Sequence, residues 1–218
     1  MSQITTTTGS LAKILGAVTP FVSRDVTLPA LNCVQLRAAD GVLAASGTDR
    51  YVIGHARQPA TGQPTGPLHL ARWDAKRLRR ELTAFIEDRE TAADEATITQ
   101  GGEFLTVTFR GVTMHLRQAE GKNYPDLEKI LSALPTHDAE GLHAPVGLTH
   151  RVIRPLLKAA ELDPFSSPRW TFDGPRKPVR VEIGDWFIAV LMPVKLQGDE
   201  QPVSVEMPGH AAAEAVAR

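Results

Sequence analysis

Two short stretches decide how this chain folds: Gly47-Thr48-Asp49-Arg50-Tyr51-Val52-Ile53 and Val190-Leu191-Met192-Pro193-Val194-Lys195-Leu196. In the first, Thr48 and Asp49 are short polar residues whose side chains cap turns, and the residues after them have the composition of a strand. The second belongs to an apolar run broken by a proline, which cannot donate to a strand ladder. Neither stretch contains a catalytic constellation. An exposed aromatic residue on a turn beside an apolar strand end is typical of a docking pocket for side chains of another protein.

Composition restricts the class of protein. The 218 residues suffice for one large or two small domains with a substantial core. Because the formal net charge is −1, any nucleic-acid contact has to come from a local basic face. The single cysteine, Cys33, excludes an internal disulfide and a cysteine-rich zinc site. No signal peptide or long apolar span is visible, so we expect a cytoplasmic protein without a membrane partner.

Hydrophobic periodicity predicts the same series of elements three times. Helices are expected after cap residues Ser10, Asp74 and Thr149. Pro155 predicts a later start for the third helix, because proline removes a backbone hydrogen bond inside a helix. Each helix is followed by three strands, which are expected at residues 31–37, 42–45, 51–57, 96–99, 104–109, 112–117, 169–172, 179–183 and 186–194. Three units of roughly 65 residues indicate an α+β fold in which each helix is buried against antiparallel sheets.

Basic residues gather on the second and third predicted helices. They recur at helical spacing beside or opposite the apolar face: Arg72, Lys76, Arg79, Arg80, Arg151, Arg154 and Lys158. A single basic helix is usually a solvated face. Two such helices in equivalent positions of a repeat favour a surface that faces phosphates. Contacts of this kind are independent of base sequence and sensitive to salt.

Several short motifs resemble the bacterial DNA polymerase III β sliding clamp, a ring that tethers polymerases to DNA. Residues 28–32 (Leu-Pro-Ala-Leu-Asn), 39–43 (Ala-Asp-Gly-Val-Leu) and 47–51 (Gly-Thr-Asp-Arg-Tyr) are similar to its middle domain. Residues 124–131 (Tyr-Pro-Asp-Leu-Glu-Lys-Ile-Leu) resemble the segment between the middle and last domains, and 190–196 resemble the last strand. The resemblance implies the DNA-clamp, or processivity, fold.

The resemblance also implies two binding surfaces. Basic helices would face the duplex, and a hydrophobic pocket would hold a short peptide from a DNA polymerase or a clamp loader. The positions that match this pocket are Leu31, Thr48, Arg50, Tyr51, Ile53, Pro125, Ile130, Val190, Met192 and Pro193. Apolar residues with an aromatic rim and a flexible methionine suit peptide capture. The alternative is that four of these residues belong to the hydrophobic core and bind no peptide: Leu31, Ile53, Ile130 and Val190. Val52 stands where the family commonly has arginine.

The chain is shorter than a family member, which carries three two-unit domains and closes a twelve-unit ring as a dimer. Residues 1–122 resemble the middle domain, 123–147 are expected to be a linker, and 148–197 resemble the second half of the last domain. Residues 198–218 are expected to be a flexible tail, which either stays disordered or folds back over the pocket. A closed ring would need more than two copies, so we expect a homo-oligomer if a ring forms.

Two functions remain open from the sequence. One is a processivity factor that tethers a DNA polymerase to duplex DNA and binds clamp-binding peptides. The other is a non-ring adaptor that captures such peptides without encircling DNA. An enzyme has little support, because the histidines are scattered and no Walker pattern or G-x-S-x-G elbow is present. We therefore expect no catalytic residues, no metal and no cofactor.

Overall fold

The computed structural model describes residues 2–62, 64, 66–121, 123–134 and 146–195. The helices of this part of the chain are α1 (Thr8–Val18), α2 (Arg72–Ala84), α3 (Arg89–Ala93), α4 (Leu127–Ser132) and α5 (His150–Ala160). The strands are β1 (Ser2–Thr7), β2 (Cys33–Ala39), β3 (Val42–Thr48), β4 (Val52–Pro59), β5 (Leu68–Ala71), β6 (Glu95–Gly101), β7 (Phe104–Phe109), β8 (Val112–Arg117), β9 (Arg169–Thr171), β10 (Val179–Ile183) and β11 (Phe187–Leu191). The predicted α+β architecture of antiparallel sheets and few helices is confirmed.

Three helices are each followed by three antiparallel strands, as the periodicity predicts. These units are α1 with β2, β3 and β4, α2 with β6, β7 and β8, and α5 with β9, β10 and β11. Two additional strands, β1 and β5, precede α1 and α2. Leu68–Ala71 is short and begins with three consecutive buried residues, so it lacks the alternation by which a strand is recognised in a sequence.

The first two units exchange their leading strands. β1 pairs antiparallel with β6, which places Ile4 opposite Ile98, and β5 pairs antiparallel with β2, which places Leu70 opposite Val34. The resulting sheets have the orders β1-β6-β7-β8 and β5-β2-β3-β4-β11-β10-β9. Neither of the first two units can therefore complete its sheet without the other.

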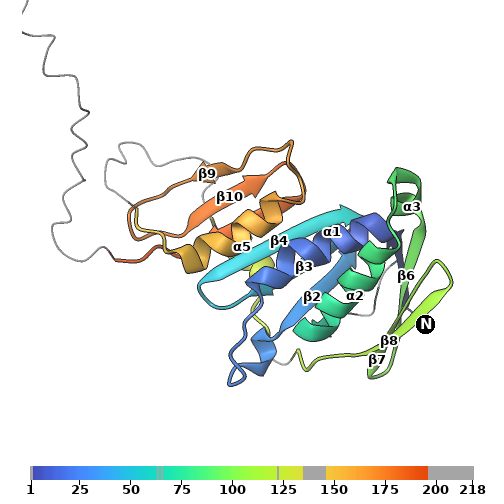
Figure 1. The fold of residues 1–218 in the computed structure, drawn as a ribbon. Helices are drawn as coiled ribbons and strands as arrows, with labels where there is room; N and C mark the ends of the chain where they lie inside the picture. The colour runs from blue at the N-terminus through green and yellow to red at the C-terminus, as the bar shows by residue number, and fades with distance from the viewer. Residues whose placement is uncertain (1, 63, 65, 122, 135–145, 196–218) are drawn as a thin grey trace, which may run out of the picture.

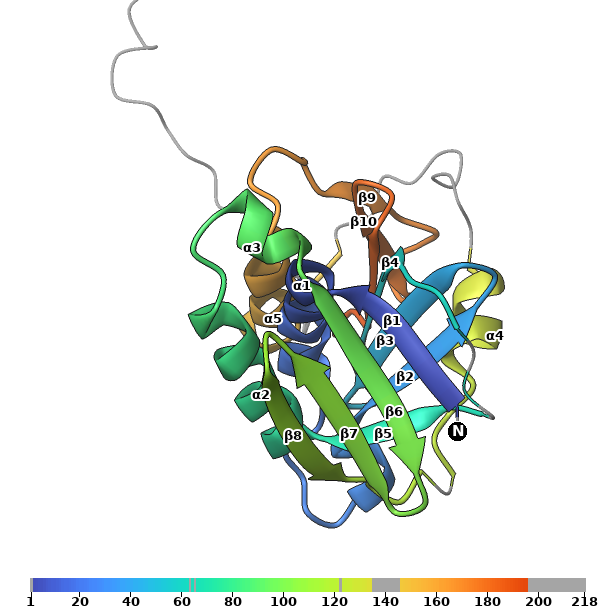
Figure 2. The same ribbon diagram turned by 90° about the vertical axis from the view of Figure 1, so that its right-hand side faces the viewer.

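The third unit extends the sheet of the first unit. β11 pairs antiparallel with β4 in a ladder that places Val190 opposite Ile53. Figure 1 shows β9 and β10 at one end of the molecule, with the four-stranded sheet of the second unit at the other end. Figure 2 shows α1, α2 and α5 on one side of the seven-stranded sheet and α4 on the other. The layering is therefore a row of three helices over one continuous sheet.

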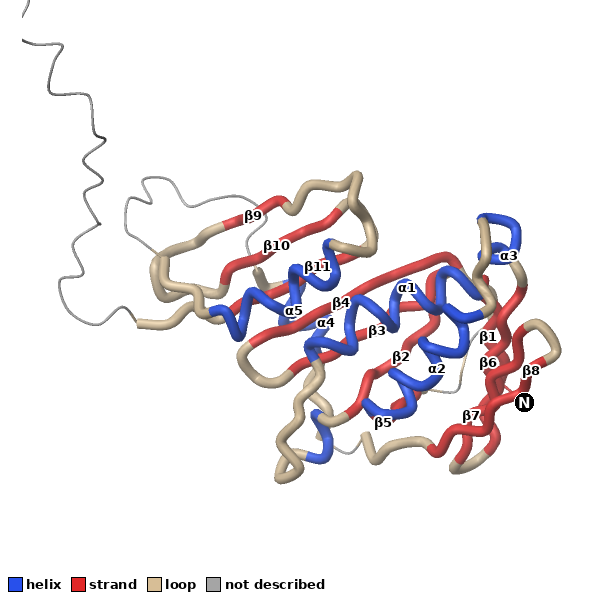
Figure 3. Tube along the Cα trace, in the orientation of Figure 1, coloured by secondary structure: helices blue, strands red, loops and turns tan. Residues whose placement is uncertain are grey.

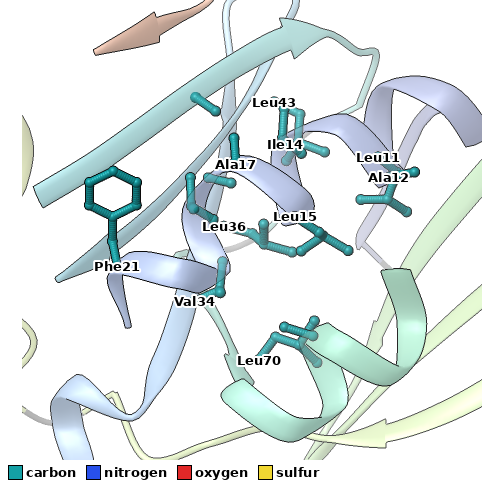
Figure 4. Packing of buried hydrophobic residues seen from close by; sticks show 14 of the residues in the cluster. Leu11, Ala12, Ile14, Leu15, Ala17, Phe21, Val34, Leu36, Leu43 and Leu70 are labelled. Atoms are coloured by element: carbon teal, nitrogen blue, oxygen red, sulfur yellow. The ribbon is translucent and has the colours of Figure 1, made fainter. Parts of the chain in front are cut away.

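The main core lies beneath α1, which packs between α2 and α5. Leu11, Ile14 and Leu15 of α1 are fully buried, and Figure 4 shows them facing Leu36, Leu43 and Leu70 of the adjacent strands. Phe21, just after α1, meets Phe187 of the third unit with ring centroids 5.7 Å apart. Burying a side chain of this size contributes roughly 1.5–3 kcal/mol. The first and third units therefore share one core as well as one sheet.

The predicted starts of the helices need correction. The Thr7 hydroxyl accepts a hydrogen bond from the Ser10 amide at 3.1 Å, so Thr7 is the cap and α1 begins at Thr8. α2 begins at Arg72, which leaves Asp74 in its first turn, where a negative charge favours the helix dipole. α5 begins at His150 and continues through Pro155, so the later start predicted from this proline is wrong.

Segment 123–147, predicted as a linker, contains a helix of its own. Asp126 caps α4 by accepting a hydrogen bond from the Lys129 amide at 3.2 Å. The predicted tail, residues 198–218, lies outside the described residues. No helix in the described ranges is long and apolar enough to cross a membrane.

Candidate functional site

A groove of about 670 Å³ runs along the helix side of the molecule. It is lined by the end of α1 and the loop after it, by α2 and by α5. The three helices lie side by side, as the tube in Figure 3 shows. The groove is therefore built from all three units.

Most of the predicted basic residues line this groove. Six of them do so: Arg72, Lys76, Arg79, Arg151, Arg154 and Lys158. Arg80 lies outside the groove, with its guanidinium 3.0 Å from the Glu81 carboxylate. Arg24, which sequence analysis missed, also lines the groove, as do Asp25, Asp49 and Glu161. We call the six predicted residues together with Arg24 the basic groove.

Two cations of the basic groove, Arg72 and Lys76, have lowered pKa values. Burial lowers the pKa of Lys76, and the neighbouring charges of Arg72, Arg24 and Lys158 lower it further. Burial and Arg24 likewise lower the pKa of Arg72. The Nε atom of Arg72 is buried without a hydrogen-bond partner among the described residues. Since a lowered pKa means that the cationic form is disfavoured, an anion in the groove would relieve this repulsion.

Gly16 of α1 sets how closely the flanking elements approach. A Cβ atom at this position would lie 2.7 Å from Arg79 Nε of α2 and 3.1 Å from Leu162, just beyond α5. The missing side chain therefore lets the guanidinium of Arg79 lie against α1, although Arg79 remains exposed. It also lets Leu162, just beyond α5, contact α1 at the same residue.

A second candidate site begins at the turn between β3 and β4. The Asp49 carboxylate accepts hydrogen bonds from the amides of Tyr51 at 2.9 Å and Val52 at 3.0 Å. The Thr48 hydroxyl donates to the Val52 carbonyl at 2.7 Å. Arg50 has a φ of 83°, in the region that favours glycine. This tight turn leaves the Tyr51 side chain 48% exposed.

Two exposed apolar side chains lie at this turn. Met192 donates its amide proton to the Tyr51 carbonyl at 2.9 Å, so Met192 and Tyr51 lie on adjacent segments. Met192 is 37% exposed. We call Tyr51 and Met192 the rim. Ile130, on α4, is 41% exposed. Arg151 ties the rim to the basic groove, since its guanidinium lies 5.2 Å from the Tyr51 ring centroid and 3.4 Å from the Asp49 carboxylate.

A small apolar cluster lies under α4. Ile53 and Val190, opposite each other in the β4–β11 ladder, pack with Leu127 and Leu131 of α4. These four side chains are buried, with Tyr124 at their edge. The Tyr124 hydroxyl donates to the Ser46 carbonyl at 3.1 Å. Ile53 and Val190 therefore support α4 from below and have little surface to offer a ligand.

The remaining predicted pocket residues differ in exposure. Leu31 and Thr48 are buried, Pro125 and Pro193 are half-buried, and Arg50 is exposed. The sequence did contain a signal for the missed residues of α4: Asp126 is a good cap, and Leu127 and Leu131 are one helical turn apart. Arg24 lies in a loop, where no periodicity marks it. In the described part of the chain, no three His, Cys, Asp or Glu residues are grouped so as to hold a metal ion.

Comparison with known proteins identifies the fold. No family model and no curated protein matches the sequence. Among solved structures, the DNA polymerase sliding clamp from Pseudomonas aeruginosa matches with a TM-score of 0.69 at 16% identity, over 89% of this chain and 67% of that one. The DNA polymerase III beta subunit from Thermotoga maritima matches with a TM-score of 0.67 at 12% identity, over 90% and 66%.

A sliding clamp from Bartonella birtlesii, also a DNA polymerase III beta subunit, matches with a TM-score of 0.66 at 14% identity, over 92% of this chain and 67% of that one. The matches thus cover about two thirds of the length of these clamps. Identities this low show the fold alone. The chain therefore has the fold of the bacterial DNA polymerase III β sliding clamps.

Proposed function

We propose that this protein is a sliding-clamp-like processivity factor, with no chemistry of its own, that tethers a DNA polymerase to duplex DNA. The observation that carries the proposal is the basic groove, in which residues from α2, α5 and the loop after α1 meet on one side of the molecule. Burial and neighbouring cations lower the pKa of Lys76 and Arg72, and a polyanion in the groove would stabilise their charged forms. Sliding requires contacts that ignore base sequence, and side chains that bind backbone phosphates provide them.

The salt dependence of DNA binding tests this proposal. Lys76→Ala combined with Arg79→Ala should weaken binding to a duplex and lower the slope of log affinity against log salt by roughly one for each lost phosphate contact. Fluorescence anisotropy with a labelled duplex at several salt concentrations measures both quantities. Two duplexes of unrelated sequence should give the same result.

The chain offers a matched control for this experiment. Arg117→Ala removes an exposed cation of β8 that lies 3.6 Å from Glu103. It should leave the salt slope unchanged. Arg80 is unsuitable as a control, because it lines a second depression together with Lys76 and Arg79. A double groove variant with the slope of the unchanged protein would refute a phosphate-binding role for the groove.

We further propose that the rim binds the clamp-binding peptides of a DNA polymerase or a clamp loader. An aromatic ring and a methionine are exposed on adjacent segments at a turn that Asp49 holds by hydrogen bonds. Such a surface can hold an apolar peptide side chain, and the flexible methionine adapts to its shape. Ile53 and Val190 would support the site from below without contacting the peptide.

A second candidate is the adaptor that captures such peptides without encircling DNA. The observation in its favour is the exposed pair Tyr51 and Met192, which can contact a peptide without any contact between the basic groove and DNA. This function predicts peptide binding that survives replacement of the groove cations and no measurable affinity for duplex DNA. The anisotropy experiment therefore separates the two functions. In either case we place the clamp-like domains at residues 1–122 and 148–197, and the protein in the cytoplasm.

A further inference from the structure

Trp73, in the first turn of α2, is the most exposed of the three tryptophans. It is 73% exposed, whereas Trp186 is buried and Trp170 is partly buried. Three exposed cations of α2 follow Trp73 at spacings of three, four and seven residues: Lys76, Arg77 and Arg80. This spacing places the indole and the three cations along one ridge of the helix. An aromatic ring in a row of cations is the composition of a surface that binds single-stranded nucleic acid.

The indole of Trp73 lies at the edge of the basic groove. Two residues that line the groove approach its ring: the Arg72 Cζ atom is 5.4 Å and the Lys76 Nζ atom is 5.0 Å from the ring centroid. Trp73 does not line the groove itself. Cations at these distances are attracted to the ring face, and the same groups can bind a phosphate. The edge of the groove therefore offers an aromatic face and positive charge side by side.

Arg72 carries a hydrogen-bond donor that has no acceptor. The residue is only 8% exposed, and its Nε atom is buried without a partner among the described residues. Buried polar groups are normally paired, and an unpaired donor on a cation is costly. A phosphate at the edge of the groove would give the Arg72 guanidinium the acceptor that it lacks. The unpaired donor therefore indicates an anionic ligand next to Trp73.

We propose that Trp73 stacks on an unpaired base of single-stranded DNA, while Arg72 and Lys76 bind the phosphates beside that base. In a duplex the faces of the bases are covered by neighbouring base pairs, so only an unstacked base can reach an exposed ring. Stacking accepts every base, so the contact keeps the independence of sequence that the proposed function requires. The inference rests on the proposed contact between the basic groove and DNA. It adds a site that distinguishes a single strand, such as a template not yet copied, from duplex DNA.

Titration of the full chain with a short oligothymidylate at fixed salt tests the proposal. Stacking on Trp73 should quench the tryptophan fluorescence, and Trp73→Phe should abolish this quench. In anisotropy with a labelled oligothymidylate, Trp73→Leu should lower the affinity by roughly 5- to 100-fold, the usual effect of losing one stacked base. Trp73→Phe keeps an aromatic face and should retain most of the affinity. Phe165→Leu is the matched control, since Phe165 is 98% exposed in the loop between α5 and β9 and does not line the groove; it should change nothing.

A labelled duplex separates this site from the groove. Both Trp73 variants should bind the duplex with the affinity and salt slope of the unchanged protein, because the groove cations are retained. An oligothymidylate affinity that Trp73→Leu leaves unchanged overturns the proposal. An equal loss for oligothymidylate and duplex also overturns it, because Trp73 would then contact the sugar–phosphate backbone. Either result with a normal duplex salt slope for the unchanged protein leaves the proposed function intact. Conversely, a quench that depends on Trp73 without any duplex binding supports this site and refutes the tether on duplex DNA.

Discussion

At the scale of single residues, the turn before β4 makes Tyr51 available to a partner. Asp49 holds the turn through two amide hydrogen bonds, and Arg50 adopts a left-handed conformation. The Tyr51 ring is thereby exposed, with the guanidinium groups of Arg50 and Arg151 at 5.8 and 5.2 Å from its centroid. Cations within about 6 Å of a ring centroid are attracted to the ring face. Contacts that favour one orientation of an exposed side chain lower the entropic cost of binding a ligand there.

This geometry predicts a loss of peptide affinity when the rim is shortened. Tyr51→Ala with Met192→Ala should weaken binding of a labelled peptide that carries a polymerase clamp-binding motif by roughly 1–3 kcal/mol, because truncating a central aromatic anchor has that effect. Fluorescence anisotropy measures the affinity. Phe104→Ala, at a 49% exposed aromatic residue of β7, is the control and should change nothing. Equal affinities for the rim variant and the unchanged protein would place the peptide elsewhere.

At the scale of elements, α4 is a short helix held to the sheet by two leucines. Leu127 and Leu131 are buried against Ile53 and Val190, whereas Ile130 points to solvent. Leu131→Ala should reduce the free energy of unfolding by roughly 2–4 kcal/mol, because it opens a cavity in this cluster. Urea denaturation monitored by circular dichroism gives this value. Ile130→Ala should cost far less, and similar losses for both variants would contradict the assigned orientation of α4.

The sequence predicts strands where apolar residues alternate, as around Val107 and Val181, or form a continuous run, as in β11. β5 is buried at consecutive positions and carries no alternation. The start of a helix is harder to predict than the helix itself. For α1, Thr7 and Ser10 are both suitable N-cap residues by type, and only the hydrogen bond from the Ser10 amide to the Thr7 hydroxyl identifies Thr7 as the cap. Helical spacing predicts the basic residues of α2 and α5. Neither the position of Arg24, which lies in a loop, nor the exposure of the rim residues can be predicted in this way, because both depend on tertiary packing.

At the scale of the whole molecule, the β4–β11 ladder makes the first and third units one cooperative structure. Phe21 of one unit packs on Phe187 of the other, and the ladder joins residues 52–56 to residues 187–191. Thermal unfolding followed by tryptophan fluorescence in a Trp73→Phe variant reports on Trp170 and Trp186, both in the third unit. Its midpoint should coincide with that from far-UV circular dichroism, which reports on all units. A lower fluorescence midpoint would show that the third unit unfolds independently.

The exchange of leading strands also fixes the order in which the protein can form during synthesis. β1 leaves the ribosome long before its partner β6, which begins at Glu95, and β2 likewise precedes its partner β5. β1 thus stays without its sheet partner while most of the second unit is translated. Contacts this distant in sequence slow folding and leave an unpaired strand open to other chains. β1 is therefore a strand of the nascent protein that needs protection from premature association until β6 has been made.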